Sequence, residues 1–177
     1  MTAPARSTEA KKLSAQVDWE AIYADQLPRV YNLFRYWMGD NALAEDLTSA
    51  TFEKAWKHRL RYRQDVAALS TWLFTVARRV AIDYFRQRHI EVALDNAVTL
   101  TTEDQPDTIA QRHSDFEHLA ELLSQLPTQE RELIALKYGA ELTYREIADL
   151  TGLSETNVGT LLSRTVQKLR AAWKVDT

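Results

Sequence analysis

Apolar residues recur every three or four positions along most of the chain, and no stretch alternates between apolar and polar residues. The plainest case runs from Trp19 to Met38, with large apolar residues at positions 19, 22, 23, 30, 31, 34, 37 and 38. This spacing is that of an amphipathic helix, whereas a half-buried strand has a period of two. The chain of 177 residues also has only 4 Gly and 4 Pro, too few for the many tight turns of an all-β fold. The sequence therefore predicts an all-α protein.

Local start and stop signals divide this helical pattern. Thr143 and Glu146 form a capping box, in which each side chain satisfies a backbone N–H at a helix start. Ser70 is placed to cap a helix that begins at the next residue. Gly139 predicts a left-handed cap at the end of a helix, because glycine adopts positive φ without steric cost. Pro28 is expected either to kink the first helix or to begin a second one.

The helical periodicity disappears between residues 91 and 112, where the chain is acidic, rich in Thr and Asp, and poor in large apolar residues. Such a composition favours a flexible linker. The sequence thus predicts a polar leader over 1–17, helical domains over 18–90 and 113–177, and the linker 91–112 between them. The N-terminal domain is expected to be a helical bundle and the C-terminal domain a helix-turn-helix domain.

Charge is divided unevenly along the chain, although the formal net charge is only −3. Nine basic residues stand against two acidic ones between positions 54 and 88, while eight acidic residues stand against one Arg between positions 91 and 121. A basic block of this kind suits a polyanion, and a solvated helix face is the alternative interpretation.

The stretch YREIADLTGLSETNVGTLLSR, residues 144–164, has the spacing of a helix-turn-helix. Ala148 is small where two helices cross closely, Gly152 tolerates positive φ in the turn, and Val158 is a branched residue to bury between the helices. Ser154 can cap the second helix. Because ordinary helical hairpins seldom meet all these requirements, DNA reading is favoured over a structural hairpin.

Docking of the second helix in a major groove would point its N-terminal residues at base edges and its later cations at phosphates. The helix supplies few cations, so the module alone is expected to bind DNA weakly. Gly159 is either a tolerated weak spot, costing about 1 kcal/mol relative to Ala, or a gap that lets the backbone approach the groove. The predicted DNA-binding residues of this element are Thr143, Tyr144, Ser154, Glu155, Thr156, Asn157, Thr160, Arg164 and Lys168.

Three segments in this order strongly resemble the extracytoplasmic-function (ECF) group of bacterial RNA polymerase sigma factors: AEDLTSATFEKAWKH, then STWLFTVARRVAIDYFRQRH, then LPTQERELIALKYGAELTYREIADLTGLSETNVGTLLSRTVQKLR. The resemblance covers residues 19–173. It implies that the first segment binds core RNA polymerase, the second opens and reads the −10 promoter element, and the third reads the −35 element.

For the first segment, the resemblance implies a helix that binds the coiled coil of the largest polymerase subunit. An acidic start and a basic end also suit a charged protein partner, with a solvated face as the alternative. The family usually has Gln and Glu where this chain has Ser49 and Ala50. The predicted polymerase-binding residues are Asp46, Leu47, Ser49, Phe52, Glu53, Lys54 and Trp56.

For the second segment, the residues agree with the implied role, because aromatic rings and cations together can hold an unpaired strand. Trp72 also lies on the apolar stripe, so it is either a core residue or a platform for a base. Asp83 is expected to pair with Arg79 or Arg86. The predicted −10 residues, including a loop that matches the family's pocket for a flipped base, are Arg61, Tyr62, Arg63, Ser70, Trp72, Arg78, Arg79, Tyr84, Arg86 and Arg88.

The resemblance implies a non-catalytic specificity subunit with promoter DNA, core polymerase (the largest-subunit coiled coil and the flap of the second-largest subunit) and an anti-sigma factor as partners. The chain has no Cys, and its four His have no metal-ligand spacing, so neither a cofactor nor a metal is expected. No signal peptide or membrane-length apolar run is present in the sequence, which favours the cytoplasm. The competing hypotheses are a stand-alone helix-turn-helix regulator and, less favoured, an enzyme.

Overall fold

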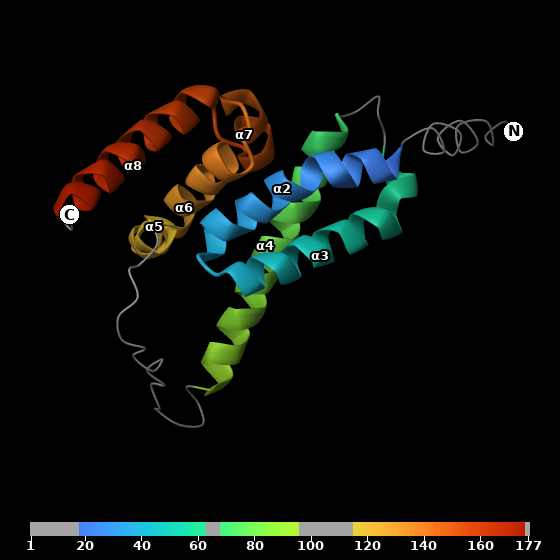
Figure 1. The fold of residues 1–177 in the computed structure, drawn as a ribbon, viewed down its shortest axis with the longest axis horizontal. Coiled ribbons are helices and arrows are strands. Elements are labelled where there is room, and N and C mark those ends of the chain that lie inside the picture. The colour runs from blue at the N-terminus through green and yellow to red at the C-terminus, as the bar shows by residue number, and fades with distance from the viewer. Residues whose placement is uncertain (1–17, 63–67, 96–114, 176–177) are drawn as a thin grey trace, which may run out of the picture.

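The structure is a computed structural model that describes residues 18–62, 68–95 and 115–175 (Figure 1). Within these ranges every regular element is a helix, which confirms the all-α prediction. The predicted leader, Arg63 and most of the predicted linker lie outside the described residues. The elements are α2 (Trp19–Met38), α3 (Asn41–His58), η1 (Arg59–Arg61), α4 (Leu69–Asp95), α5 (Asp115–Ser124), α6 (Thr128–Ile134), the π-helical turn η2 (Ala135–Gly139), α7 (Tyr144–Thr151) and α8 (Glu155–Val175).

Helices α2, α3 and α4 form what we call the N-terminal unit. The Asp18 carboxylate accepts a hydrogen bond from the Ala21 N–H at 3.0 Å and starts α2, and the Asp40 carboxylate starts α3 through the Leu43 N–H at 2.8 Å. Gly39, at φ 74°, ends α2 with a left-handed cap. Pro28 lies inside α2 and does not begin a second helix. The unit's core is built from Val30, Leu33, Phe34, Trp37, Ala44, Leu47, Ala55, Leu73, Phe74, Ala77, Val80 and Ala81.

Helix α4 differs from its predicted bounds at both ends. It begins at Leu69, and the Trp72 N–H donates to the Ala68 carbonyl at 3.0 Å, so Ser70 lies within the first turn and is not the N-cap. At the other end the helix continues to Asp95, five residues into the segment 91–112 predicted as a linker. Acidic composition alone therefore did not mark the helix end.

Helices α5 to α8 form the C-terminal unit. Glu130 of α6 accepts hydrogen bonds from Lys168 at 2.8 Å and from the Thr165 hydroxyl at 3.1 Å, which ties α6 to the middle of α8. The capping box of Thr143 and Glu146 is present at the start of α7 as predicted.

The two units pack against each other, with η2 lying on α2 (Figure 1). Gly139 has an ordinary negative φ, so it is not the left-handed cap that the sequence predicted; Glu141, at φ 57°, is the left-handed residue after this helix. A Cβ at Gly139 would lie 2.6 Å from the Asn32 carbonyl oxygen of α2. Glycine is needed at 139 because the two backbones touch there, and one buried cluster of apolar side chains runs across both units.

Candidate nucleic-acid interface

The helix-turn-helix geometry forms as the sequence predicted. Gly152 follows α7 at φ 77°, and its N–H donates to the Ala148 carbonyl at 2.9 Å. Val158 of α8 is fully buried against α7, next to the small and nearly buried Ala148. The Ser154 hydroxyl accepts a hydrogen bond from the Asn157 N–H at 3.2 Å and so caps α8.

Most residues predicted to contact DNA from α8 share one exposed face. A shallow open groove is lined by Tyr144 of α7 and, from α8, by Glu155, Thr156, Thr160 and Arg164. Asn157 is also exposed, at the start of the helix. The same groove is lined by Ser163 and Gln167, which the sequence reasoning did not include. Their positions, three and seven residues beyond Thr160, are those that a helix places on one face.

Gly159 has a local role that neither sequence interpretation included. A Cβ at this position would lie 3.3 Å from the Tyr144 ring, so the absence of a side chain leaves room for that ring at the groove. The Lys137 ammonium lies 5.1 Å from the centre of the same ring on the C-terminal unit. The absence of a side chain at Gly159 therefore allows the Tyr144 ring to lie at the groove.

Lys168 is engaged within the C-terminal unit. Its ammonium donates to both carboxylate oxygens of Glu130, at 2.8 and 3.0 Å. The hydrogen bond from Lys168 lowers the pKa of the Glu130 carboxyl below its ordinary value, against the opposing effect of burial. Lys168 is thus less available to a phosphate than Arg164, which is exposed.

The basic face of α4 combines exposed and paired cations. Arg79 is exposed. Arg86 donates to Asp83 at 3.1 Å, one of the two pairings predicted for that aspartate, and Lys54 of α3 approaches the same carboxylate at 3.5 Å. Such exposed pairs add little stability and leave the cations accessible.

Two further cations of α4 meet neutral or acidic side chains. Arg88 donates to the Tyr84 hydroxyl at 2.8 Å, one turn before it on the same helix. Arg78, by contrast, pairs with Glu132 of α6 in the C-terminal unit. The predicted −10 surface therefore includes one arginine that another part of the chain already binds.

Trp72 belongs to an aromatic cluster near the start of α4. Its ring lies 6.2 Å from that of Trp19 and 5.5 Å from that of Tyr62, and it is half-buried. Tyr62 is buried, and burial raises the pKa of its hydroxyl. Arg61 is exposed and Ser70 is half-buried beside this cluster. The arrangement fits the core interpretation of Trp72 better than a freely exposed platform.

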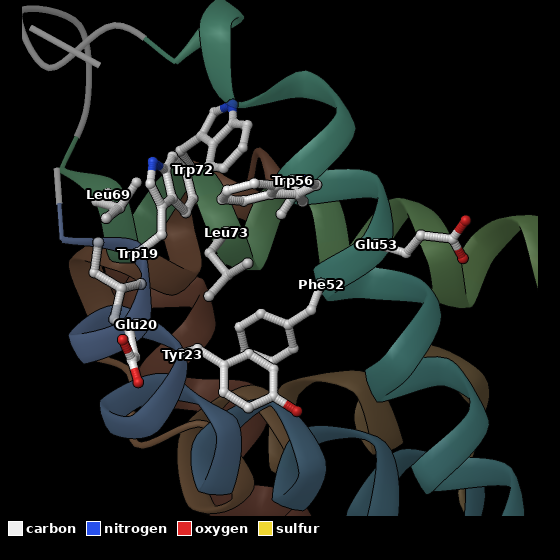
Figure 2. A pocket seen from close by; sticks show the side chains of 11 residues that line it. Trp19, Glu20, Tyr23, Phe52, Glu53, Trp56, Leu69, Trp72 and Leu73 are labelled. Carbon is white, nitrogen blue, oxygen red and sulfur yellow. The ribbon is translucent and has the colours of Figure 1, made fainter. Parts of the chain in front are cut away.

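The cluster borders an apolar pocket of about 480 Å³ between α2, α3 and the start of α4, shown in Figure 2. Trp19, Trp56 and Trp72 lie at one end of the pocket. The rings of Tyr23 and Phe52, whose centres are 4.6 Å apart, lie at the other end. The sequence did not predict that these rings share a cavity.

The predicted polymerase-binding residues of α3 divide between surface and core. Asp46, Ser49, Glu53 and Lys54 are exposed, and Trp56 is 52% exposed. Leu47 is buried in the bundle, so its side chain supports the helix from within.

Two local contacts order the exposed face of α3. Lys57 donates to Glu53 one turn earlier at 2.5 Å and lowers the pKa of that carboxyl. The Arg59 guanidinium stacks on the Trp56 ring at 3.9 Å from its centre. The exposed face of α3 is therefore charged at its start and aromatic at its end.

Comparisons with known proteins agree with this arrangement in both units. The family model described as Sigma-70 region 2 matches residues 22–90, and that described as Sigma-70, region 4 matches residues 116–169. The ECF RNA polymerase sigma factor SigM of Bacillus subtilis is 33% identical over 155 residues, covering 87% of this chain and 94% of that protein. The sigma factor CarQ of Myxococcus xanthus is 32% identical over 160 residues, covering 88% of this chain and 89% of that protein.

Solved structures show the same fold. The sigma factor RpoE of Bartonella quintana, solved in complex with the anti-sigma factor NepR, superposes with a TM-score of 0.72 at 24% identity, covering 90% of this chain and 99% of that one. CnrH, solved in complex with the cytosolic domain of CnrY, superposes with a TM-score of 0.63 at 20% identity, covering 98% and 100%. Within the described part of this chain, no helix has both the length and the apolar character that a bilayer span requires.

Proposed function

The chain belongs to the ECF sigma factors of RNA polymerase, and from this membership we propose how its surfaces divide the work of promoter recognition. As an alternative sigma factor it binds core polymerase and directs transcription initiation, and it is not a stand-alone regulator. Two surfaces on the same chain support this assignment. One is the exposed face of the helix-turn-helix on α8, and the other is the aromatic and basic face of α4.

The C-terminal unit reads the −35 element in this proposal. Asn157, Thr160 and their exposed neighbours contact base edges, while Arg164 contacts phosphate. Asn157→Ala is expected to change the preferred −35 sequence, whereas Arg164→Ala is expected to weaken binding to all sequences and to reduce its salt dependence. Equal effects of the two substitutions on every promoter would contradict the assignment.

The N-terminal unit reads and helps to open the −10 element. Exposed Arg79, Arg86 and Arg88 supply the phosphate contacts, and the half-buried Tyr84 accepts a hydrogen bond from Arg88. The half-buried ring of Trp72 lies nearer the start of the same helix. We place this activity in residues 18–90, the −35 activity in 113–177, and the connection between them in 91–112.

The exposed face of α3 binds the coiled coil of the largest polymerase subunit, and the C-terminal unit binds the flap of the second-largest subunit. Asp46 is the cleanest probe, since its carboxylate is exposed and its loss leaves the core intact. Asp46→Ala is expected to lower affinity for core polymerase, measured by fluorescence anisotropy. Glu20→Ala removes an exposed acid from α2, which has no polymerase contact in this proposal, and serves as the matched control; equal losses in both variants would contradict the α3 assignment.

The chain acts in the cytoplasm, performs no catalysis itself, and is held inactive by an anti-sigma factor. The solved relative RpoE supports this kind of partner, because its structure was solved in complex with the anti-sigma factor NepR. Gel-shift measurements with promoter DNA test the proposal as a whole. We expect weak binding by the chain alone and specific binding with core polymerase; specific binding that core polymerase does not improve would refute it.

A further inference from the structure

The apolar pocket between α2, α3 and the start of α4 is a cavity to which the proposed function assigns no ligand (Figure 2). Its volume of about 480 Å³ is within the range of about 300–1,000 Å³ that small-molecule sites have in proteins. Two of its aromatic side chains are largely exposed, Tyr23 by 48% and Trp56 by 52%. Large rings that line a hollow, with no packed neighbours over them, mark a place where a ligand can displace water.

The rings around this pocket are set at steep angles to one another. The Trp19 ring is 6.1 Å from the Trp56 ring at an interplanar angle of 90°, and 6.2 Å from the Trp72 ring at 71°. At the other end of the pocket the Tyr23 and Phe52 rings meet at 62°. The faces of aromatic rings carry partial negative charge, and that of Trp attracts cations most strongly. Rings of this kind around one space form an aromatic cage, which suits a cation.

One of these rings already holds a cation of the chain itself. The Arg59 guanidinium lies 3.9 Å from the centre of the Trp56 ring. Arg59 is not among the residues that line the pocket, so its guanidinium does not fill the cavity. Trp56 therefore attracts a cation while the pocket beside it stays open.

The charge of the lining favours a positive ligand. The charged residues of the described lining are two acids, Glu20 and Glu53, and none is basic. Lys57, which does not line the pocket, donates to Glu53. Glu20 is exposed and has no ion pair within the described residues. Such a lining disfavours phosphates, and with them a DNA strand or a nucleotide.

We propose that this pocket is a binding site for a small quaternary ammonium compound. A quaternary ammonium group has no N–H to donate, and its charge is spread over apolar methyl groups. It therefore loses no hydrogen bond to water inside apolar walls, whereas a primary ammonium or a guanidinium would. Lipid headgroups also carry a trimethylammonium group, but the volume of the cavity fits a free small molecule, which is the occupant we infer.

The binding test uses the full-length chain and choline chloride as the probe, with ionic strength held constant by sodium chloride. Three of the 5 Trp of the chain line the pocket, so binding is followed by tryptophan fluorescence. The matched ligand is 3,3-dimethylbutan-1-ol, which has the shape of choline with carbon in place of the charged nitrogen. We expect saturable binding of choline and about tenfold weaker binding of the neutral alcohol, because the cation–π attraction is lost.

Two exposed side chains of the pocket can be changed without altering the core or removing a tryptophan. Tyr23→Leu removes one aromatic wall and is expected to weaken choline binding about fivefold. Glu20→Gln removes one negative charge and is expected to weaken it about threefold. Tyr138→Leu is the matched control, because Tyr138 is 50% exposed and lies on η2 in the C-terminal unit; it should bind choline as the unaltered chain does.

Equal affinity for choline and for the neutral alcohol would overturn the proposal, because the pocket would then select shape and not charge. The absence of a saturable change, or an equal loss in Tyr23→Leu and Tyr138→Leu, would also overturn it. Binding to phosphatidylcholine vesicles without binding of choline would assign the site to a lipid surface and refute a free ligand. These measurements need no polymerase, so their failure is distinguishable from failure of the proposed function, which transcription with core polymerase reports.

Discussion

The ion pair between Glu130 and Lys168 offers the sharpest energetic prediction. It joins α6 to α8, and the Glu130 carboxylate also accepts a bond from the buried Thr165 hydroxyl. Glu130 is 18% exposed and Lys168 is 59% exposed, so the pair lies at the rim of the C-terminal unit. Water screens the lysine more than the carboxylate, and the attraction is weaker than in a buried pair.

We expect Glu130→Gln to lower the free energy of unfolding by about 1 kcal/mol. This value is at the upper end of the range for exposed ion pairs, because the Glu130 carboxylate is mostly buried. For a chain of this size that corresponds to a fall in Tm of about 2–4 °C. In a double-mutant cycle with Lys168→Met, the coupling is expected to be about 0.5–1 kcal/mol. Glu53→Gln, which removes an ion pair exposed at both ends, serves as the control and should leave Tm unchanged.

The coupling has a defined pH dependence. The folded-state pKa of Glu130 is lowered, chiefly by the hydrogen bond from Lys168. A lowered pKa means that the stabilisation is complete above the unfolded-state value, roughly 4.3, and is lost as pH falls through the lower folded-state value. Chemical denaturation of the unaltered chain, the two single variants and the double variant, at neutral and acidic pH, measures this pH dependence. A coupling near zero at neutral pH, or one that persists unchanged after the carboxylate is protonated, would refute the reasoning.

Three other substitutions test the helix-turn-helix and its binding face. Thr143→Ala removes the capping box and should cost about 1 kcal/mol of unfolding free energy, whereas Thr143→Ser should cost much less; equal losses would contradict the cap. Val158→Ala removes two buried methyl groups and should cost about 2 kcal/mol by denaturant titration, with a smaller loss for the surface change Ser163→Ala. Gly159→Ala should displace the Tyr144 ring and lower affinity for −35 DNA in a gel-shift assay with core polymerase; unchanged affinity would show that the position of Tyr144 is unimportant.

Features set by neighbouring residues were predictable from the sequence. The capping box at Thr143, the left-handed Gly152 and the buried Val158 each depend on residues within one helix pair, so spacing alone determined them. The exposed contact face of α8 followed from helical periodicity for the same reason, and its extension to Ser163 and Gln167 could have been read from that period.

Features set by distant residues were not predictable. Gly139 was interpreted as a left-handed cap, because the sequence gives no sign that its neighbour in space is Asn32, more than one hundred positions earlier. The same limit applies to the pairing of Arg78 with Glu132 and to the shared pocket of Trp19, Trp56 and Trp72. A charge or ring pattern indicates which side chains are available, whereas tertiary packing decides which of them meet.

The most direct test of the central claim is run-off transcription with core polymerase on a library of promoters with randomised −10 and −35 elements. A sigma factor with two reading surfaces predicts transcripts only when the chain is present, from promoters that share two sequence elements at a fixed separation. Arg164→Ala should lower transcription from all of these promoters, because we propose that this exposed arginine contacts phosphate and not a base edge. Transcripts that do not depend on the chain, or selected promoters that share no such pair of elements, would contradict the account.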